Sequence, residues 1–270
     1  MRPITTAVTL LGRSVNSTLE FVGGMGYLLY DAAAAVQRGL FGKRGRRLGW
    51  QNLWAQMVRV GVRAIPIVSL VVWCIGSILS LQMVPELRKY GATSRVADII
   101  SIAMFRELGP LVSAIVLTGF AGASIAAEMG TMVVSEEIEA LEAHAISPIR
   151  FLVMPRVLAT TVMMVCLAVV GDIMGVFGGM LTCRLFVGID MRQYLGLTFD
   201  AVGLKDFITG LFKAAVFGSI ISGMACYLGL RVTGGAQGVG VATTRTVVLT
   251  IVALIFVDLL FTAVFFFLGI

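Results

Sequence analysis

The sequence predicts an all-α membrane protein with five transmembrane helices, preceded by interfacial amphipathic helices and carrying a short cytoplasmic helix between the second and third spans. Of its 270 residues, 58% are hydrophobic and only 13% are charged, and the mean hydropathy is +0.97. Such a chain has too little polar surface to cover a soluble globule. Five apolar runs approach or exceed the roughly 20 residues that a spanning helix needs, at 65–81, 108–127, 157–183, 214–230 and 246–270.

Residues 1–63 are expected to form the interfacial helices, and residues 64–270 the five-span domain. Five apolar side chains recur at helical spacing just before the first span, with polar residues between them: Trp50, Leu53, Trp54, Met57 and Val58. This pattern indicates a helix lying in the cytoplasmic membrane interface. A cytosolic helix packed on a partner is the alternative.

The basic residues set the expected orientation. Nine of the 21 Lys and Arg residues precede residue 65, including the cluster at 43–47. The positive-inside rule places this end of the chain in the cytoplasm. Five spans then leave the C-terminus on the periplasmic side of the membrane.

Proline and glycine residues predict further features of the first and third spans. Pro66 lies at the start of the first span, where a missing N–H is tolerated, and Pro85 is expected to end that span. Gly171, Gly175 and Gly179 recur every four residues in the third span. This stripe of small residues predicts close contact with another helix.

The loop between the second and third spans is expected to hold an acidic helix at about 134–146. Ser135 can cap it, and Ile138 and Leu141 form an apolar ridge opposite the acidic face. Such a helix suits docking into a groove of a partner protein, whereas a charged surface helix without a partner is the alternative. The acidic face consists of Glu136, Glu137, Glu139 and Glu142.

Ionisable residues at or within the spans are the first candidates for function, because charges in the hydrocarbon are costly. Arg106 and Glu107 stand at the head of the second span. They could form an ion pair, or the guanidinium could bind an anionic lipid headgroup. Asp172, Lys213 and Asp258 could pair between helices or serve transport, and Lys213 could also extend toward the outer interface.

Other chemistry finds little support. His144 is the single histidine, and the four cysteines form no CxxC pair, so no metal site is expected. The glycine-rich stretch 234–240 lacks the GK[ST] ending of a phosphate loop and is expected to be a flexible turn. The basic residues are not interleaved with aromatics as in a nucleic-acid-binding domain. Nothing supplies a catalytic constellation, so we expect a subunit that is not an enzyme.

Four separated motifs carry a family resemblance. They are RELGP at 106–110, GFAGASIAAEMGTM at 119–132, EEIEALEAHAISPIRFLVMPRVLA at 136–159 and ATTRTVV at 242–248. Together they resemble the MlaE family of ABC-transporter permeases, over most of the chain from about residue 50 onward.

The resemblance implies the permease subunit of an ATP-driven phospholipid transporter in the bacterial inner membrane. Such systems move lipid between that membrane and a periplasmic ring of MCE-domain subunits and are linked to outer-membrane lipid asymmetry. The permease is expected to form a homodimer with two cytoplasmic ABC ATPase subunits, the MCE ring and a small STAS-domain protein. No cofactor is expected in this chain, because ATP and Mg would bind the ATPase.

The resemblance also implies roles for particular residues. Arg106 and Glu107 would lie near the lipid headgroup, and the acidic helix, including Leu141, would couple to the ATPase. Two alternatives stay open: a structural anchor for the ring and the ATPase, and an ion-coupled carrier that uses Asp172, Lys213 and Asp258. Further lipid contacts would come from the end of the first span and its loop, at Leu79, Met83, Leu87 and Tyr90.

Overall fold

A computed structural model describes residues 2–41, 46–93 and 95–269. For residues 2–11, 13–15, 17–18, 38–41 and 46–51 it describes the backbone alone. Lys43 and Arg44 of the predicted basic cluster, and the side chain of Trp50, therefore lie outside the described part.

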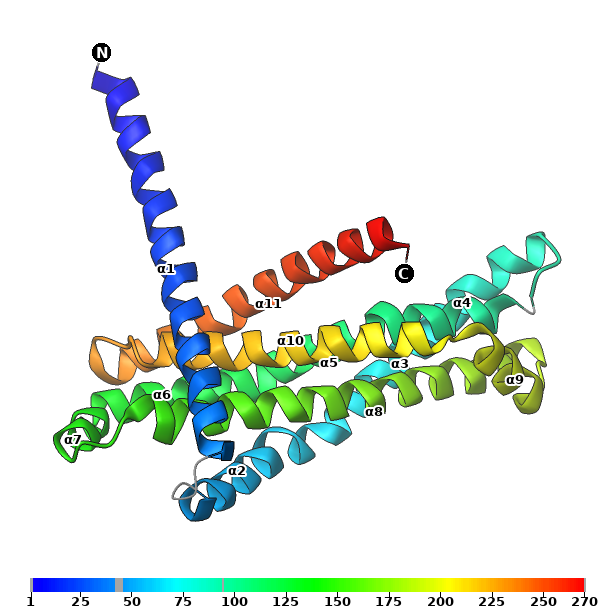
Figure 1. Cartoon of the computed structure of the whole chain (residues 1–270). Helices are drawn as coiled ribbons and strands as arrows, with labels where there is room; N and C mark the ends of the chain where they lie inside the picture. The colour runs from blue at the N-terminus through cyan, green and yellow to red at the C-terminus, as the bar shows by residue number, and fades with distance from the viewer. Residues whose placement is uncertain (1, 42–45, 94, 270) are drawn as a thin grey trace.

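All elements in the described residues are helical, as predicted (Figure 1). The chain begins with α1 (Arg2–Phe41), α2 (Arg46–Val60), η1 (Val62–Ala64), α3 (Ile65–Lys89) and α4 (Arg95–Ala103). It continues with η2 (Met104–Leu108), α5 (Gly109–Leu117), η3 (Thr118–Gly122), α6 (Ala123–Val134), α7 (Glu137–Ala143) and η4 (Ile149–Val153). It ends with α8 (Met154–Val187), α9 (Met191–Ala201), α10 (Leu204–Gly229) and α11 (Gly235–Leu268).

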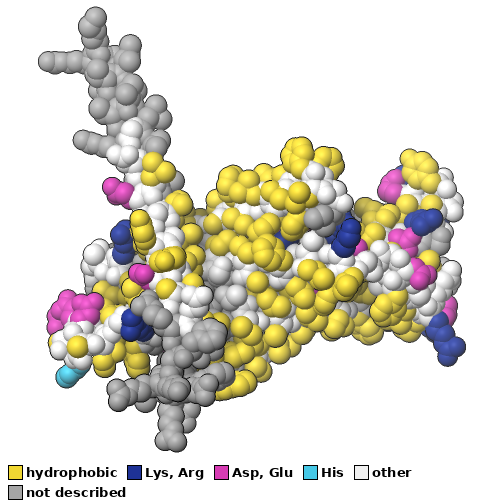
Figure 2. Space-filling view, in the orientation of Figure 1, with side chains coloured by type: hydrophobic (Ala, Val, Ile, Leu, Met, Phe, Trp, Pro, Cys, Tyr) yellow, Lys and Arg dark blue, Asp and Glu magenta, His cyan; other side chains and the backbone are white. Residues whose placement is uncertain are grey.

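Five helical stretches are long and apolar enough to cross a membrane, which confirms the predicted number. Several join consecutive elements, since η1 connects α2 to α3 and the segments from α4 to α6 form one continuous rod. The stretches are Asn52–Lys89, Arg95–Val134, Ile149–Val187, Leu204–Gly229 and Gly235–Leu268. In Figure 2 hydrophobic side chains cover the middle of the visible face, and charged side chains gather toward the two ends.

Helix α1 is a single long helix whose N-terminal half projects from the bundle (Figure 1). Near its middle it packs on α10, where the rings of Phe21 and Tyr227 meet edge to face at 5.2 Å between centroids. Gly24 lies against the Tyr227 hydroxyl, and a side chain at this position would collide with it. The interfacial position predicted for residues 1–63 stays a prediction.

Helix α2 exposes part of its predicted apolar face, and its interfacial position stays a prediction. Trp54 and Val58 are exposed, as a helix face in contact with lipid requires, and among the described side chains at 52–60 the buried ones are Gln56 and Val60. The buried side of α2 packs on α8. The helix is therefore part of the bundle as well as a candidate for the interface.

Pro85 does not end the first span, contrary to the prediction. Helix α3 continues through it to Lys89. A proline inside a helix removes the hydrogen bond to the carbonyl four residues earlier and its ring crowds that carbonyl, so the helix needs support from its surroundings to continue. The turn around it is held by packing, because Val84 is buried and Leu87 contacts the core.

The glycine stripe of the third span brings two helices into close contact, as predicted. Gly76 of α3 and Gly175 of α8 lie backbone to backbone, so that a Cβ at Gly76 would overlap the facing helix. Ser77 and Ser80 of α3 donate hydrogen bonds of 3.2 Å to carbonyls of α8, at Gly178 and Gly179. Small residues thus let the two backbones approach.

Two further elements differ from the predictions. The glycine-rich stretch expected as a flexible turn is mostly helical, because α11 begins at Gly235. Only Gly234 and Gly235 adopt positive φ there, at 88° and 67°. Helix α9 was not predicted, since it is short and precedes the apolar run of the fourth span.

Candidate functional site

The second span is not a continuous α-helix, and its first irregular turn carries Arg106 and Glu107. In the π-helical segment η2, Gly109 donates its N–H to the carbonyl oxygen five residues earlier, that of Met104. Pro110 follows and has no N–H to donate, which favours an interruption of the regular α-helical hydrogen bonds. Single π turns within α-helices occur often at functional sites.

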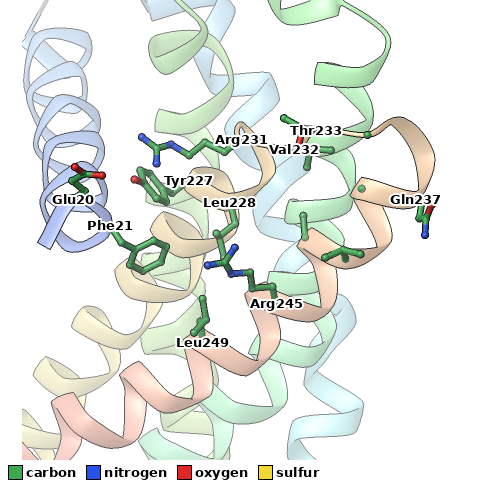
Figure 3. A pocket seen from close by; sticks show the side chains of 14 residues that line it. Glu20, Phe21, Tyr227, Leu228, Arg231, Val232, Thr233, Gln237, Arg245 and Leu249 are labelled. Carbon is green, nitrogen blue, oxygen red and sulfur yellow. The ribbon is translucent and has the colours of Figure 1, made fainter. Parts of the chain in front are cut away.

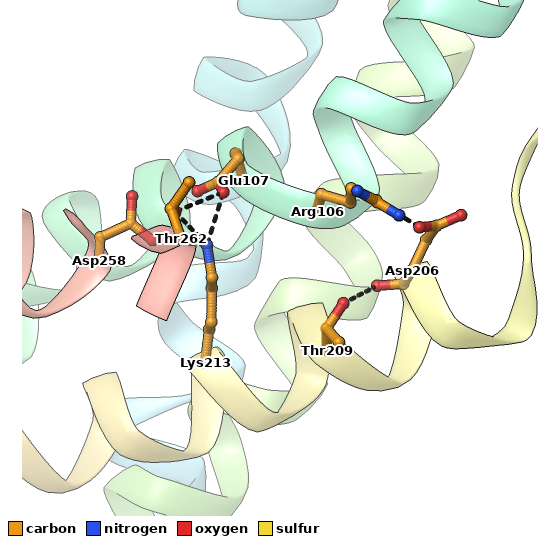
Figure 4. A network of polar contacts seen from close by, with 7 residues as sticks. All are labelled: Arg106, Glu107, Asp206, Thr209, Lys213, Asp258 and Thr262. Carbon is orange, nitrogen blue, oxygen red and sulfur yellow. Dashed lines mark hydrogen bonds and ion pairs between the residues drawn. The ribbon is translucent and has the colours of Figure 1, made fainter. Parts of the chain in front are cut away.

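Arg106 forms an ion pair with Asp206, in the first turn of α10 (Figure 4). The Asp206 carboxylate also accepts a 2.8 Å hydrogen bond from the N–H of Gly203, so it caps the helix that it belongs to. The Arg106 side chain is 44% exposed, and only its Nε finds an acceptor among the described residues. The rest of the guanidinium can therefore bind an anion.

Lys213 is the centre of a second, buried cluster, and its side chain is only 1% exposed. Its Nζ donates to carboxylates from two elements, Glu107 at 2.7 Å and Asp258 at 3.0 Å. Thr262 accepts from Lys213 at 3.1 Å and donates to Glu107 at 2.8 Å. Lys213 thus ties η2, α10 and α11 together (Figure 4) and does not extend toward the outer interface as the sequence had allowed.

The two clusters share one pocket of about 160 Å³. Its polar wall comes from three charged side chains of the two clusters and from two threonines. Its apolar wall comes from two aromatic rings of α11, one of which lies 5.8 Å from the Lys213 Nζ. A volume of this size holds a headgroup fragment, not a two-tailed lipid. The pocket is lined by Arg106, Glu107, Thr209, Lys213, Thr262, Phe265 and Phe266.

The other predicted lipid contacts do not line this pocket. Leu79 and Leu87 are partly buried against the core, while Tyr90 is 81% exposed at the end of α3. Met83 is half-buried. A lipid contact for these four side chains stays a prediction.

Asp172, the third predicted intramembrane charge beside Lys213 and Asp258, lies apart from their cluster. It is buried in α8 against Gly109, and its Oδ1 has no hydrogen-bond partner in the described part of the chain. The structure therefore brings Lys213 and Asp258 together with Glu107 and leaves Asp172 alone.

Near the opposite end of the bundle, Glu128 joins three elements. Its carboxylate in α6 pairs with Arg59 of α2 at 2.8 Å and with Arg156 of α8 at 3.0 Å. The Arg156 side chain is 4% exposed and also donates to the carbonyl of Leu152 at 2.9 Å. Glu128 lies in α6, which ends at Val134 shortly before α7, so this cluster lies toward the end of the bundle that carries the acidic loop.

The acidic helix exists as α7 but is shorter than predicted. Ser135 does not cap it; Glu136 is the capping residue, with a left-handed φ of 60°, and the Ser135 hydroxyl donates to Glu137 at 3.0 Å. Ile138 and Leu141 pack on the core as the apolar ridge requires. The exposed acidic face therefore consists of Glu136, Glu137, Glu139 and Glu142.

Comparison with known proteins decides the family. A family profile described as Permease MlaE matches residues 53–264, which contain the second to fourth spans and most of the first and the fifth. The chain belongs to the MlaE permease family. It is therefore the non-catalytic membrane subunit of an ABC transporter, whose ATPase is a separate subunit.

Individual relatives of this MlaE-family permease agree. A probable ABC transporter permease protein of Rickettsia typhi is 38% identical over 78% of this chain and 82% of its own length. The chloroplastic protein TRIGALACTOSYLDIACYLGLYCEROL 1 of Arabidopsis thaliana is 32% identical over 87% of this chain and 66% of its own length. The intermembrane phospholipid transport system permease protein MlaE of Haemophilus influenzae is 29% identical over 97% of this chain and 98% of its own length.

Sequence reasoning missed two acidic side chains as ion-pair partners, Asp206 and Glu128. Asp206 and Lys213 are seven residues apart in α10, so they lie on one helix face and offer opposite charges to Arg106 and Glu107. That spacing was a usable signal. The pairing of Glu128 with Arg156 had none, because the two residues lie in different spans.

Proposed function

We propose that this permease moves phospholipid between the bacterial inner membrane and a periplasmic ring of MCE-domain subunits, driven by ATP hydrolysis in its partner ATPase. Arg106 binds the lipid phosphate, and the Glu107–Lys213–Asp258 cluster holds the wall of the site. The relative from Haemophilus influenzae, named for phospholipid transport, supports the substrate class.

One observation carries this proposal: a half-exposed guanidinium beside aromatic rings. Arg106 is oriented by Asp206 and keeps further N–H groups available in a pocket that Phe265 and Phe266 line. A guanidinium binds phosphate oxygens in a bidentate fork, and charge-assisted hydrogen bonds are the strong ones. Glu107 is already bonded to Lys213 and Thr262, so its part is to position the site.

The small pocket also supports a homodimer. A diacyl lipid exceeds the volume of about 160 Å³, so its acyl chains must lie outside the pocket. Helix α11 forms one wall and exposes an apolar face there, including Phe266 and Phe267. A second copy facing this helix completes a lipid cavity between the two subunits.

The acidic face of α7 is the proposed contact for the ATPase. Its glutamates are exposed while Ile138 and Leu141 hold the helix on the bundle, so movement of the helix is transmitted to the spans.

ATP and Mg belong to the ATPase, and a STAS-domain protein is a further proposed partner. In this arrangement α7 and the N-terminus face the cytoplasm, and the C-terminus faces the periplasm. ATP-driven movement requires two states of the cavity that differ in lipid affinity.

Replacement of the guanidinium tests the proposal. In the complete transporter, reconstituted with its ATPase and MCE partner in proteoliposomes, Arg106→Gln should lower ATP-dependent transfer of labelled phospholipid about tenfold, because charge-assisted hydrogen bonds are lost. Assembly and ATP hydrolysis should persist. Arg88→Gln removes an exposed charge from the end of α3 and serves as the matched control.

Two results would contradict the proposal. Unchanged lipid transfer by Arg106→Gln would remove the headgroup role and leave the structural anchor as the better account. Transfer that follows a proton gradient without ATP would favour the ion-coupled carrier.

A further inference from the structure

We propose that a cavity at the α7 end of the bundle, between α1 and the turn joining α10 to α11, binds a second phospholipid through its phosphate. The cavity has a volume of about 640 Å³, within the range of small-molecule sites. Figure 3 shows the side chains of Arg231 and Arg245 directed into the space between α1 and α11. This site is separate from the Arg106 pocket and shares none of its residues.

The charge of the lining selects a phosphate. Arg231 and Arg245 line the cavity and form no ion pair with any described residue, and Glu20 on α1 is the one acidic side chain of the lining. Two guanidinium groups against one carboxylate leave a net positive site. Phosphate oxygens match the guanidinium fork.

Arg231 is already oriented. Its guanidinium lies over the ring of Tyr227, 4.5 Å from the centroid, and Tyr227 is itself buried and held by Phe21 of α1. Stacking holds the face of the guanidinium and leaves its N–H edge available. Little side-chain freedom is then lost when an anion binds.

An apolar groove continues from the cavity along α11. The groove of about 490 Å³ shares Val241, Arg245 and Leu249 with the cavity and adds Val248. Beyond it Val252 and Ile255 are exposed on the same helix. A ligand that fits both parts has a phosphate at one end and hydrocarbon chains at the other.

The depth of the site also suits a lipid. Arg245 immediately precedes the apolar run that begins at residue 246, and Arg231 lies in the turn just after α10. Basic side chains at such boundaries lie at the level of lipid headgroups. The occupant is therefore a membrane phospholipid with its phosphate between Arg231 and Arg245 and its chains along α11.

Photolabelling of the full chain tests the site by position. A phosphatidylethanolamine with a diazirine in one acyl chain should label residues 241–255, and Arg231→Gln/Arg245→Gln should lower this labelling about tenfold, since two charge-assisted contacts are lost. The control Arg88→Gln/Arg192→Gln removes two exposed charges from the other end of the bundle and should keep the label. A diacylglycerol with the same diazirine should label weakly in every variant.

A matched pair of substitutions in α11 tests the groove. Val248→Asn should lower labelling of residues 241–255, while Val264→Asn, exposed near the other end of α11, should not. Arg106→Gln should leave this label unchanged, so the outcome is independent of the proposed transport site.

Three outcomes would overturn the proposal. Labelling that survives the double arginine variant, or that is equal for the two probes, would mean that the phosphate is not recognised. Labelling that is unchanged in Val248→Asn would show a phosphate site without a role for the groove. A change in oligomeric state in Arg231→Gln/Arg245→Gln would make the cavity a contact between copies of the chain.

Discussion

Helices α10 and α11 follow each other in the chain, both span the membrane, and differ most in burial. Within the most apolar stretch of each helix, 72% of the residues of α10 are buried but only 11% of those of α11. Yet α11 is the most hydrophobic of the five spans and α10 the least. In a membrane the most hydrophobic helix can face lipid. The interior of the bundle instead contains small and polar residues, which allow helices to pack closely.

The composition of α10 shows the cause. Gly210 and Gly218 face the backbones of neighbouring helices, and Asp206 and Lys213 supply its ion pairs. Helix α11 offers only Asp258 as a charged residue to the bundle at this depth. The contact between Lys213 and Asp258 thus ties the exposed helix to the buried one.

The largest expected effect comes from breaking that contact. Lys213→Met leaves Glu107 and Asp258 facing each other without a cation and should cost about 3 to 5 kcal/mol of stability, as for other buried pairs that lose one partner. Thermal unfolding of the purified chain in detergent measures the loss. The combined variant Lys213→Met/Glu107→Gln/Asp258→Asn should recover most of it; no recovery would mean that Lys213 acts by packing alone.

A smaller effect is expected from adding one methyl group to each helix. At Gly218 in α10 a Cβ would lie 2.7 Å from the Cα of Thr161 and 2.8 Å from the Cβ of Met164, so Gly218→Ala should cost about 1 to 3 kcal/mol. At Gly240 in α11 a Cβ meets nothing within 4 Å, and Gly240→Ala should be neutral or stabilising. Equal melting temperatures for the two variants would contradict the tight packing of α10.

The smallest effect is expected on the exposed face of α11. Val252 is 60% exposed, and Val252→Ala should change the stability of a single subunit by less than about 0.5 kcal/mol. Thermal unfolding at several protein concentrations distinguishes two cases. A larger loss that depends on concentration would show that the second copy of the proposed homodimer also covers α11 at Val252, where lipid is expected.

Hydropathy predicted the five spans because each apolar run is about as long as the membrane is thick. It could not predict burial, since α10 and α11 are ranked oppositely by hydropathy and by packing. The stripe from Gly171 to Gly179 did predict a close helix contact, because small residues have little other use at that spacing. Helix α9 escaped prediction because it lies outside the apolar runs.

The site was predicted in part. Arg106 and Glu107 stood out because charges beside an apolar run are costly, and the structure places both in one pocket. Asp206 was missed although its seven-residue spacing from Lys213 was a usable signal, whereas Thr262 was not identified because its contact depends on which helices pack together. Lys213 does not extend toward the outer interface, because α11 brings Asp258 beside it.

The π turns of the second span set the phase of everything beyond them. Each residue advances an α-helix by about 100°, and a π turn holds one residue more than an α turn. Segments η2 and η3 both precede Glu128. The two extra residues that they contain therefore determine the direction in which the Glu128 side chain points from the helix. A chain shortened by one residue at η2 would close this turn as a regular α turn and keep Glu128 facing Arg156, whereas the same deletion within α5 would rotate Glu128 by about 100° away from Arg156.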